Sequence, residues 1–366
     1  MKKLKLLCLT VIIILLLSLS VSAEYYTARS LGMGGAYTGM AGDISSVLYN
    51  PASVSGESYL EIYASGGART GQMAELQRLA GVFDGSLEST NLTADELEEF
   101  PDHLSGEAQF FAGGGLRYAA LSSVMRTSLD ASKEDVSGNT EAVVNSSFQR
   151  ETMLTLGGEL TSPPLNLGRL TLGANLKRIK KKNITYDYLL TDSGDGLVET
   201  CGSGGTMGVD AGILAQITSA LSAGLQVRNL YTPEIEMEYE EKEKEYSDGK
   251  WVTTDSRGLE PETEAMTRSL RTGASLDLPL AEVTVAADVD NLLEEEKRIY
   301  HLGVEKRLIF NVLSLRAGRI AGSGRDPLYT AGLGLNAWKL HFDLGAGSSD
   351  GFSDDVALFT AARVRF

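Results

Sequence analysis

Residues 28–54 read ARSLGMGGAYTGMAGDISSVLYNPASV, and this stretch decides the predicted fold. It contains five glycines among small alanines and serines, and it closes on Asn50-Pro51-Ala52. Glycine lets a chain turn freely and lie close to a wall, whereas proline fixes φ and favours an extended residue before it. No helical or strand period runs through the stretch for long. It cannot form a core alone, so we interpret it as a plug threaded through a cavity that the rest of the chain builds.

The same residues carry a family resemblance. The runs Leu31–Tyr37 and Tyr49–Ala52, with Asp43 and Ser45-Ser46 between them, resemble the amino-terminal signature of FadL-like outer-membrane proteins, and of their PorV/PorQ branch in particular. A phosphate-binding loop is the competing interpretation, but such loops need a preceding strand or a Gly-Lys pair, and neither is present. The resemblance implies an outer-membrane β-barrel whose plug motif here is Gly32, Gly34, Gly35, Asp43, Asn50, Pro51 and Ala52.

The amino terminus has the pattern of a secretory signal peptide. Lys2, Lys3 and Lys5 precede an apolar run, and Val21-Ser22-Ala23 forms a small-residue cleavage site. We therefore divide the chain into a signal peptide (1–23), an amino-terminal plug (24–56) and an outer-membrane barrel (57–366).

Composition fits an exported barrel. The formal net charge of −16 disfavours a nucleic-acid partner, which requires concentrated positive charge. Cys201 would be the one cysteine left after cleavage, so no intramolecular disulfide is expected. Forty glycines and a mean hydropathy of −0.06 suit a membrane barrel, whose strands alternate apolar and polar residues.

Alternation and turn chemistry predict an all-β chain, a transmembrane antiparallel β-barrel of about 14 strands between Tyr59 and Phe366. Short links alternate with long polar ones over the second half, as expected for periplasmic turns and outer loops. Two longer stretches interrupt the strands. Residues 72–100 have helical periodicity and are predicted to form a helical extracellular insertion, and residues 231–266 an acidic extracellular loop, with Lys181–Gly205 as a further loop.

The polar faces of the predicted strands supply charges for the lumen. Between Tyr25 and Ser55 the sole acid is Asp43, so we expect it to pair with a lumenal arginine, while Asn50 holds the turn before Pro51. Charges in a confined interior also stabilise it through networks. The predicted lumenal charges are Asp210, Arg228, Arg271, Asp288, Glu305, Arg316, Arg363 and Arg365.

No enzyme constellation emerges from the sequence. The three histidines, His103, His301 and His341, lie on separate elements without metal-ligand spacing. We therefore predict neither catalysis nor a cofactor or metal. Two functions stay open: passage of small hydrophobic molecules across the outer membrane, and a PorV-like interaction role in protein secretion or surface attachment. The expected partners are outer-membrane lipid and the barrel-assembly machinery, with a hydrophobic small molecule or a secreted protein as cargo.

The terminal aromatic residue resembles an assembly signal of outer-membrane barrels. We predict that deleting Phe366, or replacing it by a charged residue, impairs assembly more than an equal change at Phe359, which has the opposite strand parity. Heat-modifiable migration on a gel measures assembly. Equal assembly of the two variants would reject the signal.

Overall fold

The computed structural model describes residues 26–40, 43–55, 60–72, 103–136, 139–160, 168–190, 196–247, 250–322, 326–349 and 354–366. The predicted signal peptide (1–23) lies outside these residues. So does the predicted helical insertion (72–100), except for Gln72 at the end of a strand.

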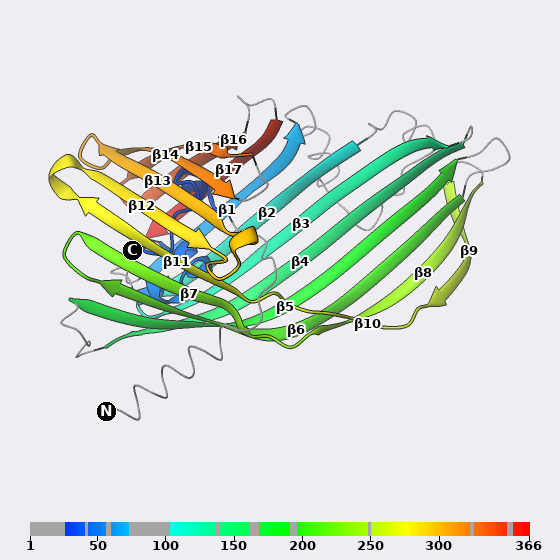
Figure 1. The fold of residues 1–366 in the computed structure, drawn as a ribbon, viewed down its shortest axis with the longest axis horizontal. Helices are drawn as coiled ribbons and strands as arrows, with labels where there is room; N and C mark the ends of the chain where they lie inside the picture. The colour runs from blue at the N-terminus through cyan, green and yellow to red at the C-terminus, as the bar shows by residue number, and fades with distance from the viewer. Residues whose placement is uncertain are drawn as a thin grey trace.

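A closed antiparallel barrel forms the body of the molecule, as predicted (Figure 1). Each strand pairs with the next, and the first pairs with the last, for example Tyr63 with Arg363, which closes the cylinder. The fourteen barrel strands are β1 (Leu60–Gln72), β2 (His103–Leu116), β3 (Ala119–Val136), β4 (Asn139–Glu159), β5 (Arg169–Leu190), β6 (Gly196–Gln216), β7 (Leu221–Tyr231), β11 (Ser269–Leu278), β12 (Val283–Asp290), β13 (Ile299–Leu308), β14 (Leu313–Gly322), β15 (Leu328–Ala337), β16 (Leu340–Ser348) and β17 (Asp354–Arg365).

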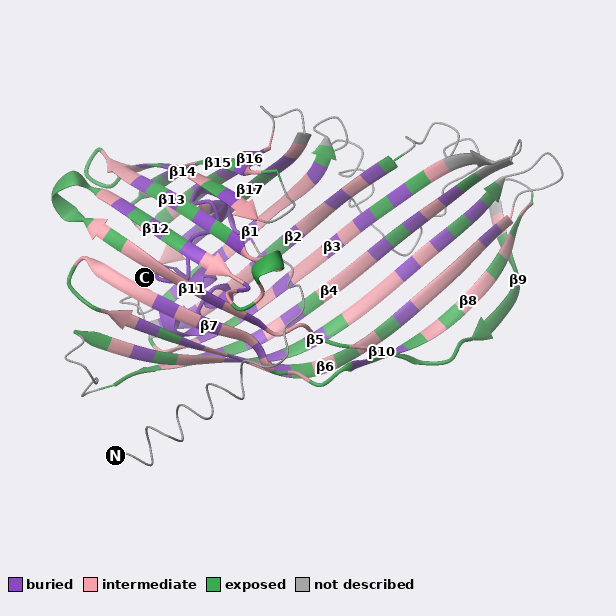
Figure 2. Ribbon diagram, viewed as in Figure 1, coloured by how far each residue is buried: buried purple, intermediate pink, exposed green. Residues whose placement is uncertain are grey.

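The outer face of the shorter strands is apolar. Successive residues of a strand point to opposite faces, and buried and exposed positions alternate along the strands (Figure 2). The pairing register places apolar side chains side by side across strands. An apolar band around a closed barrel, with every backbone group paired within the wall, is the surface that faces lipid. One outward row across seven strands consists of Leu276, Val285, Val304, Ala317, Ala331, Ala346 and Leu358.

The wall is much taller on one side than on the other. Strands β11 to β16 have 8 to 10 residues each, close to the roughly 9–11 residues that cross a bilayer. Strands β3 to β6 have 18 to 22 residues. The tall side therefore extends beyond the membrane, on the side of the long links.

Three more strands add to the tall side: β8 (Ile235–Ser247), β9 (Lys250–Gly258) and β10 (Glu262–Glu264). Strand β8 pairs with the first part of β6, from Gly196 to Gly204. Strand β7 pairs with the last part of β6, from Val209 to Gln216. The predicted loops at 181–205 and 231–266 are thus wrong in their secondary structure. Both are mostly strand, and charged residues occupy both faces there because water, not lipid, surrounds this part of the wall.

The remaining described elements are short helices. They include α2 (Ala28–Gly32), η1 (Ile44–Leu48) and η2 (Pro51–Ser55), which precede the barrel in sequence, and η4 (Pro279–Ala281) and η5 (Glu295–Lys297) between strands. Among the described residues, no helix combines the length and apolarity needed to cross a membrane.

Candidate functional site

Residues 26–40 and 43–55, called the inner segment below, run through the interior of the barrel (Figure 1). Helix α2 lies against β14 to β17 and β1, η1 against β1 and β2, and η2 against β3 to β6. Among its residues with described burial, every one except Arg29 is buried. The described part of residues 28–54 is therefore enclosed by the wall.

Glycine lines the wall where the inner segment passes. A Cβ added to Gly318 on β14 would lie 2.2 Å from Gly34 N, and one added to Gly345 on β16 would lie 2.3 Å from Ala28 O. No side chain fits at such distances, so glycine is required for this close approach. Four more barrel glycines face backbone atoms of the inner segment in this way: Gly173, Gly224, Gly303 and Gly332. Three others face side chains of the segment instead: Gly115 faces Ile44, Gly157 faces Val54 and Gly212 faces Asn50.

The inner segment contributes glycines of its own. Gly34 and Gly35 have φ of +61° and +77°, a region that glycine enters without strain. An added Cβ on Gly32 would lie 3.0 Å from Gly332 Cα. Gly32, Gly34 and Gly35 of the predicted plug motif thus serve a turn and a backbone-to-backbone contact.

Arg29 lies at the centre of a buried charge network. Its guanidinium contacts both carboxylate oxygens of Glu305 at 3.2 Å and Asp43 Oδ2 at 3.2 Å. Arg316 Nε also contacts Glu305, at 2.6 Å, and Arg316 Nη1 contacts Asp343 at 2.7 Å. Glu305, Arg316 and Asp343 come from β13, β14 and β16, so Arg29 contacts a charge network that spans these strands through Glu305.

Asp43 pairs with an arginine of the wall, as expected from the sequence. Arg363 Nη1 lies 3.4 Å from Asp43 Oδ2, Tyr37 Oη donates to the same oxygen at 2.6 Å, and Ser45 N donates to Oδ1 at 3.0 Å. Burial opposes ionisation of this carboxyl, but Arg363 and Arg29 outweigh it and hold the pKa of Asp43 below its usual value. The carboxylate is therefore charged and fully partnered.

A second set of contacts fixes the middle of the inner segment. Asp288 Oδ2 on β12 accepts hydrogen bonds from Tyr37 N at 2.7 Å and Thr38 N at 2.8 Å. Arg271 Nη2 on β11 donates to Gly35 O at 2.6 Å, and His301 Nδ1 on β13 lies 2.8 Å from Gly34 O. These side chains bond the segment's backbone, so they hold its path rather than one of its side chains.

Asn50 links the turn before Pro51 to the wall. Its Oδ1 accepts from Ala52 N at 3.0 Å, which closes the turn. Its Nδ2 donates to Thr38 O at 3.0 Å and to Ile213 O on β6 at 2.9 Å. The side chain thus bonds backbone groups, as predicted, and also joins two parts of the segment to a strand.

A third cluster of charged side chains lies on strands β4 to β7, close to η1. Lys177 on β5 is fully buried and lies 2.8 Å from Asp210 Oδ1 and 3.5 Å from Glu151 Oε2. Arg228 Nη2 contacts Glu151 at 2.9 Å. Nearby, Asn175 Nδ2 donates to Asp210 at 3.2 Å and to Val47 O at 3.1 Å, which connects this cluster to the inner segment.

Seven of the eight predicted lumenal charges lie in these three clusters. Arg365, the eighth, pairs with Glu61 Oε2 at 2.6 Å near the short-turn end. Sequence reasoning missed Arg29, Glu61, Glu151, Lys177 and Asp343 as network members. Asp343 could have been found, because it lies on the polar face of an alternating strand, whereas Arg29 lies in a stretch without periodicity.

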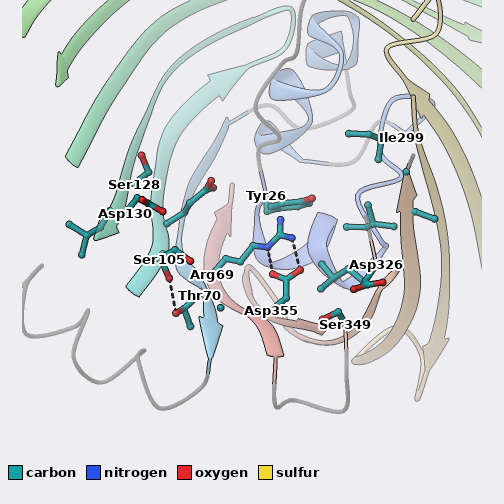
Figure 3. A pocket seen from close by; sticks show the side chains of 18 residues that line it. Tyr26, Arg69, Thr70, Ser105, Ser128, Asp130, Ile299, Asp326, Ser349 and Asp355 are labelled. Carbon is teal, nitrogen blue, oxygen red and sulfur yellow. Dashed lines mark hydrogen bonds and ion pairs between the residues drawn. The ribbon is translucent and has the colours of Figure 1, made fainter. Parts of the chain in front are cut away.

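The inner segment separates two cavities. One, of about 770 Å³, lies on the side of the long links and includes Tyr26 (Figure 3). The other, of about 470 Å³, lies on the side of the short turns and includes Met40, Asp43 and Ile44.

Comparison with known proteins gives the family. Residues 36–290 match the family model described as "F plasmid transfer operon, TraF, protein". The chain belongs to this family. No curated protein matches this TraF-family chain.

Solved structures with a similar fold include two toluene transporters. The toluene transporter TbuX of Ralstonia pickettii has a TM-score of 0.57 at 11% identity, with 94% of this chain and 99% of that chain covered. The toluene transporter TodX of P. putida has a TM-score of 0.56 at 12% identity, with 94% and 99% covered. A Pseudomonas aeruginosa FadL homologue has 0.51 at 12%, with 95% and 100% covered. The predicted FadL-like resemblance therefore holds for the fold of this TraF-family protein.

We predict that Gly318→Val displaces the inner segment while the barrel still assembles. The new side chain would enter the space of Gly34 N, and the strand ladder does not depend on that contact. Limited proteolysis should then cut within residues 26–55 at least several-fold faster. Gly158→Val is the matched control, since an added Cβ there meets nothing within 4 Å. Equal protection of both variants would contradict the close-packing argument.

We predict that Asp43→Ala loosens the inner segment without unfolding the barrel. Removing one partner of a buried ion pair leaves Arg29 and Arg363 short of a counter-charge, at about 3–5 kcal/mol when burial is full. Faster protease cleavage of residues 26–55, or greater leak of small solutes, reports the change. A variant as protected and as tight as the parent would show that Asp43 does not hold the segment.

Proposed function

We propose that this protein is an outer-membrane channel for small hydrophobic molecules, closed by residues 26–55 acting as a plug. The observation that carries the proposal is a closed barrel whose interior is divided into two cavities by a segment held through hydrogen bonds and ion pairs. The predicted signal peptide supports this proposal, and so does the fold shared with the toluene transporter TbuX and the monoaromatic hydrocarbon channel CymD.

Passage would require the plug to shift, because the two cavities lie on opposite sides of it. Its contacts suit a reversible shift. The contacts that fix its position along the barrel are charged and polar, and its backbone lies on glycine at several points of the wall. Apolar side chains of the segment, such as Leu31, Met33 and Tyr37, also pack in the buried core of the barrel. Water or a ligand group can replace the charged and polar partners, whereas repacking interlocked side chains would need a larger rearrangement.

An interaction barrel of the PorV type is the second candidate. Strand β8 favours this role, because it belongs to the wall that extends beyond the membrane and has five exposed acids along its length. These are Glu236, Glu238, Glu240, Glu243 and Glu245. The family description, which names a transfer operon, is compatible with such a role. In this reading the barrel is an anchor, and the acidic wall binds a secreted protein.

Uptake in whole cells separates the two candidates. The protein is expressed in a bacterium whose outer membrane lacks other channels for hydrophobic molecules. Fractionation first establishes that the protein reaches the outer membrane. We expect faster uptake of the dye N-phenyl-1-naphthylamine than in cells without the protein, and a further rise with Asp43→Ala. The control is a variant with Glu238, Glu240 and Glu243 changed to Gln, which should keep the parent's rate. Uptake at the background rate in both parent and Asp43→Ala would reject the channel.

A further inference from the structure

The larger cavity lies between Tyr26 and the long-link ends of the strands around it (Figure 3). Tyr26 is the first described residue of the inner segment, and its ring lies 6.3 Å, centroid to centroid, from that of Phe359. Any molecule that entered from the long-link side would meet this cavity before it met the plug.

The cavity has two chemically different walls. Ile299, Ile320 and Leu328, from β13, β14 and β15, line one side and are buried. Ser105, Ser128 and Asp130, from β2 and β3, line the other side, where Figure 3 shows them opposite Ile299. A molecule that satisfies both walls has an apolar body and a hydrogen-bonding head.

More acidic than basic side chains line the cavity. Arg69 is the one cation among the described lining residues, and it contacts both carboxylate oxygens of Asp355, at 2.6 and 2.7 Å. Glu107 is held by Arg126 at 3.0 Å. Asp130 and Asp326 also line the cavity, are exposed, and have no ion-pair partner among the described residues. A second carboxylate brought beside them would be repelled, and a cation would be attracted.

Tyr26 offers a further contact. The residue is 7% exposed, and its hydroxyl has no hydrogen-bond partner among the residues that the structure describes. A buried hydroxyl without a partner costs free energy, which a ligand's polar head would recover. Figure 3 places Tyr26 between Ile299 and the polar wall, at the boundary where such a head would meet the apolar body.

We propose that this cavity binds small amphiphiles with a cationic or neutral hydrogen-bonding head, in the order amine, alcohol, carboxylate. The inference rests on the proposed channel function and names the class of molecule that the channel admits. Asp130 and Asp326 attract the head, Tyr26 bonds it, and Ile299, Ile320 and Leu328 receive the apolar body.

Three probes of the same shape test the order: 2-phenylethylamine, 2-phenylethanol and phenylacetate. Binding to the full-length protein in lipid nanodiscs is measured by calorimetry. We expect the amine to bind at least tenfold more tightly than phenylacetate, with the alcohol between them. Asp130→Asn should reduce the amine-to-alcohol ratio several-fold, and Tyr26→Phe should weaken the alcohol several-fold. Glu282→Gln, an exposed acid at the opposite end of the barrel, is the control and should change nothing.

Each result has one meaning. Phenylacetate binding as tightly as the amine would overturn the proposal, and so would an amine preference that Asp130→Asn leaves unchanged. If none of the three probes binds, the cavity is not the selective site. Dye uptake in cells is measured separately, so a channel that fails this binding test remains distinguishable from a barrel that transports nothing.

Discussion

The close passage of one backbone along another is the constraint on which the rest of the structure depends. Gly318 and Gly345 leave no room for a side chain where residues 28 to 34 run past β14 and β16. The inner segment matches them with its own glycines and with alanine and serine. At these positions both surfaces are reduced to the backbone, so that the segment fits against the wall.

Close packing alone does not fix how far the segment is inserted, and the buried charges supply that register. Arg29 meets carboxylates from the segment and from β13, and Asp288 accepts two consecutive backbone N–H groups. Buried ion pairs contribute little net stability, because the cost of desolvation offsets their attraction. Removing one partner of such a pair is nevertheless strongly destabilising, because it leaves the other charge buried and uncompensated. The arrangement therefore specifies one position strongly while it remains open to competition by water or ligand.

The barrel could be predicted from the sequence because lipid imposes a strict rule on its outer face. Strands such as β12 and β16 alternate clearly between apolar and polar residues, and the predicted barrel of about 14 strands rests on this alternation. The rule ends where the membrane ends. Residues 181–190 and 235–247 are strand, but they carry charges on both faces and look like loop. The Lys177–Asp210–Glu151 cluster was also incomplete in the sequence, because Lys177 and Glu151 meet only through pairing of β4, β5 and β6.

A disulfide between the segment and the wall tests the central claim most directly. Ala28 N lies 3.2 Å from Ser65 Oγ on β1, so cysteines at 28 and 65, in a chain with Cys201→Ser, are within reach of each other. The account predicts that mild oxidation of intact cells links the two positions, seen as one disulfide-joined peptide by mass spectrometry. Dye uptake should then stop and return on reduction. Failure to form the link, or uptake unchanged by a complete link, would contradict a segment that lies in the barrel and closes it.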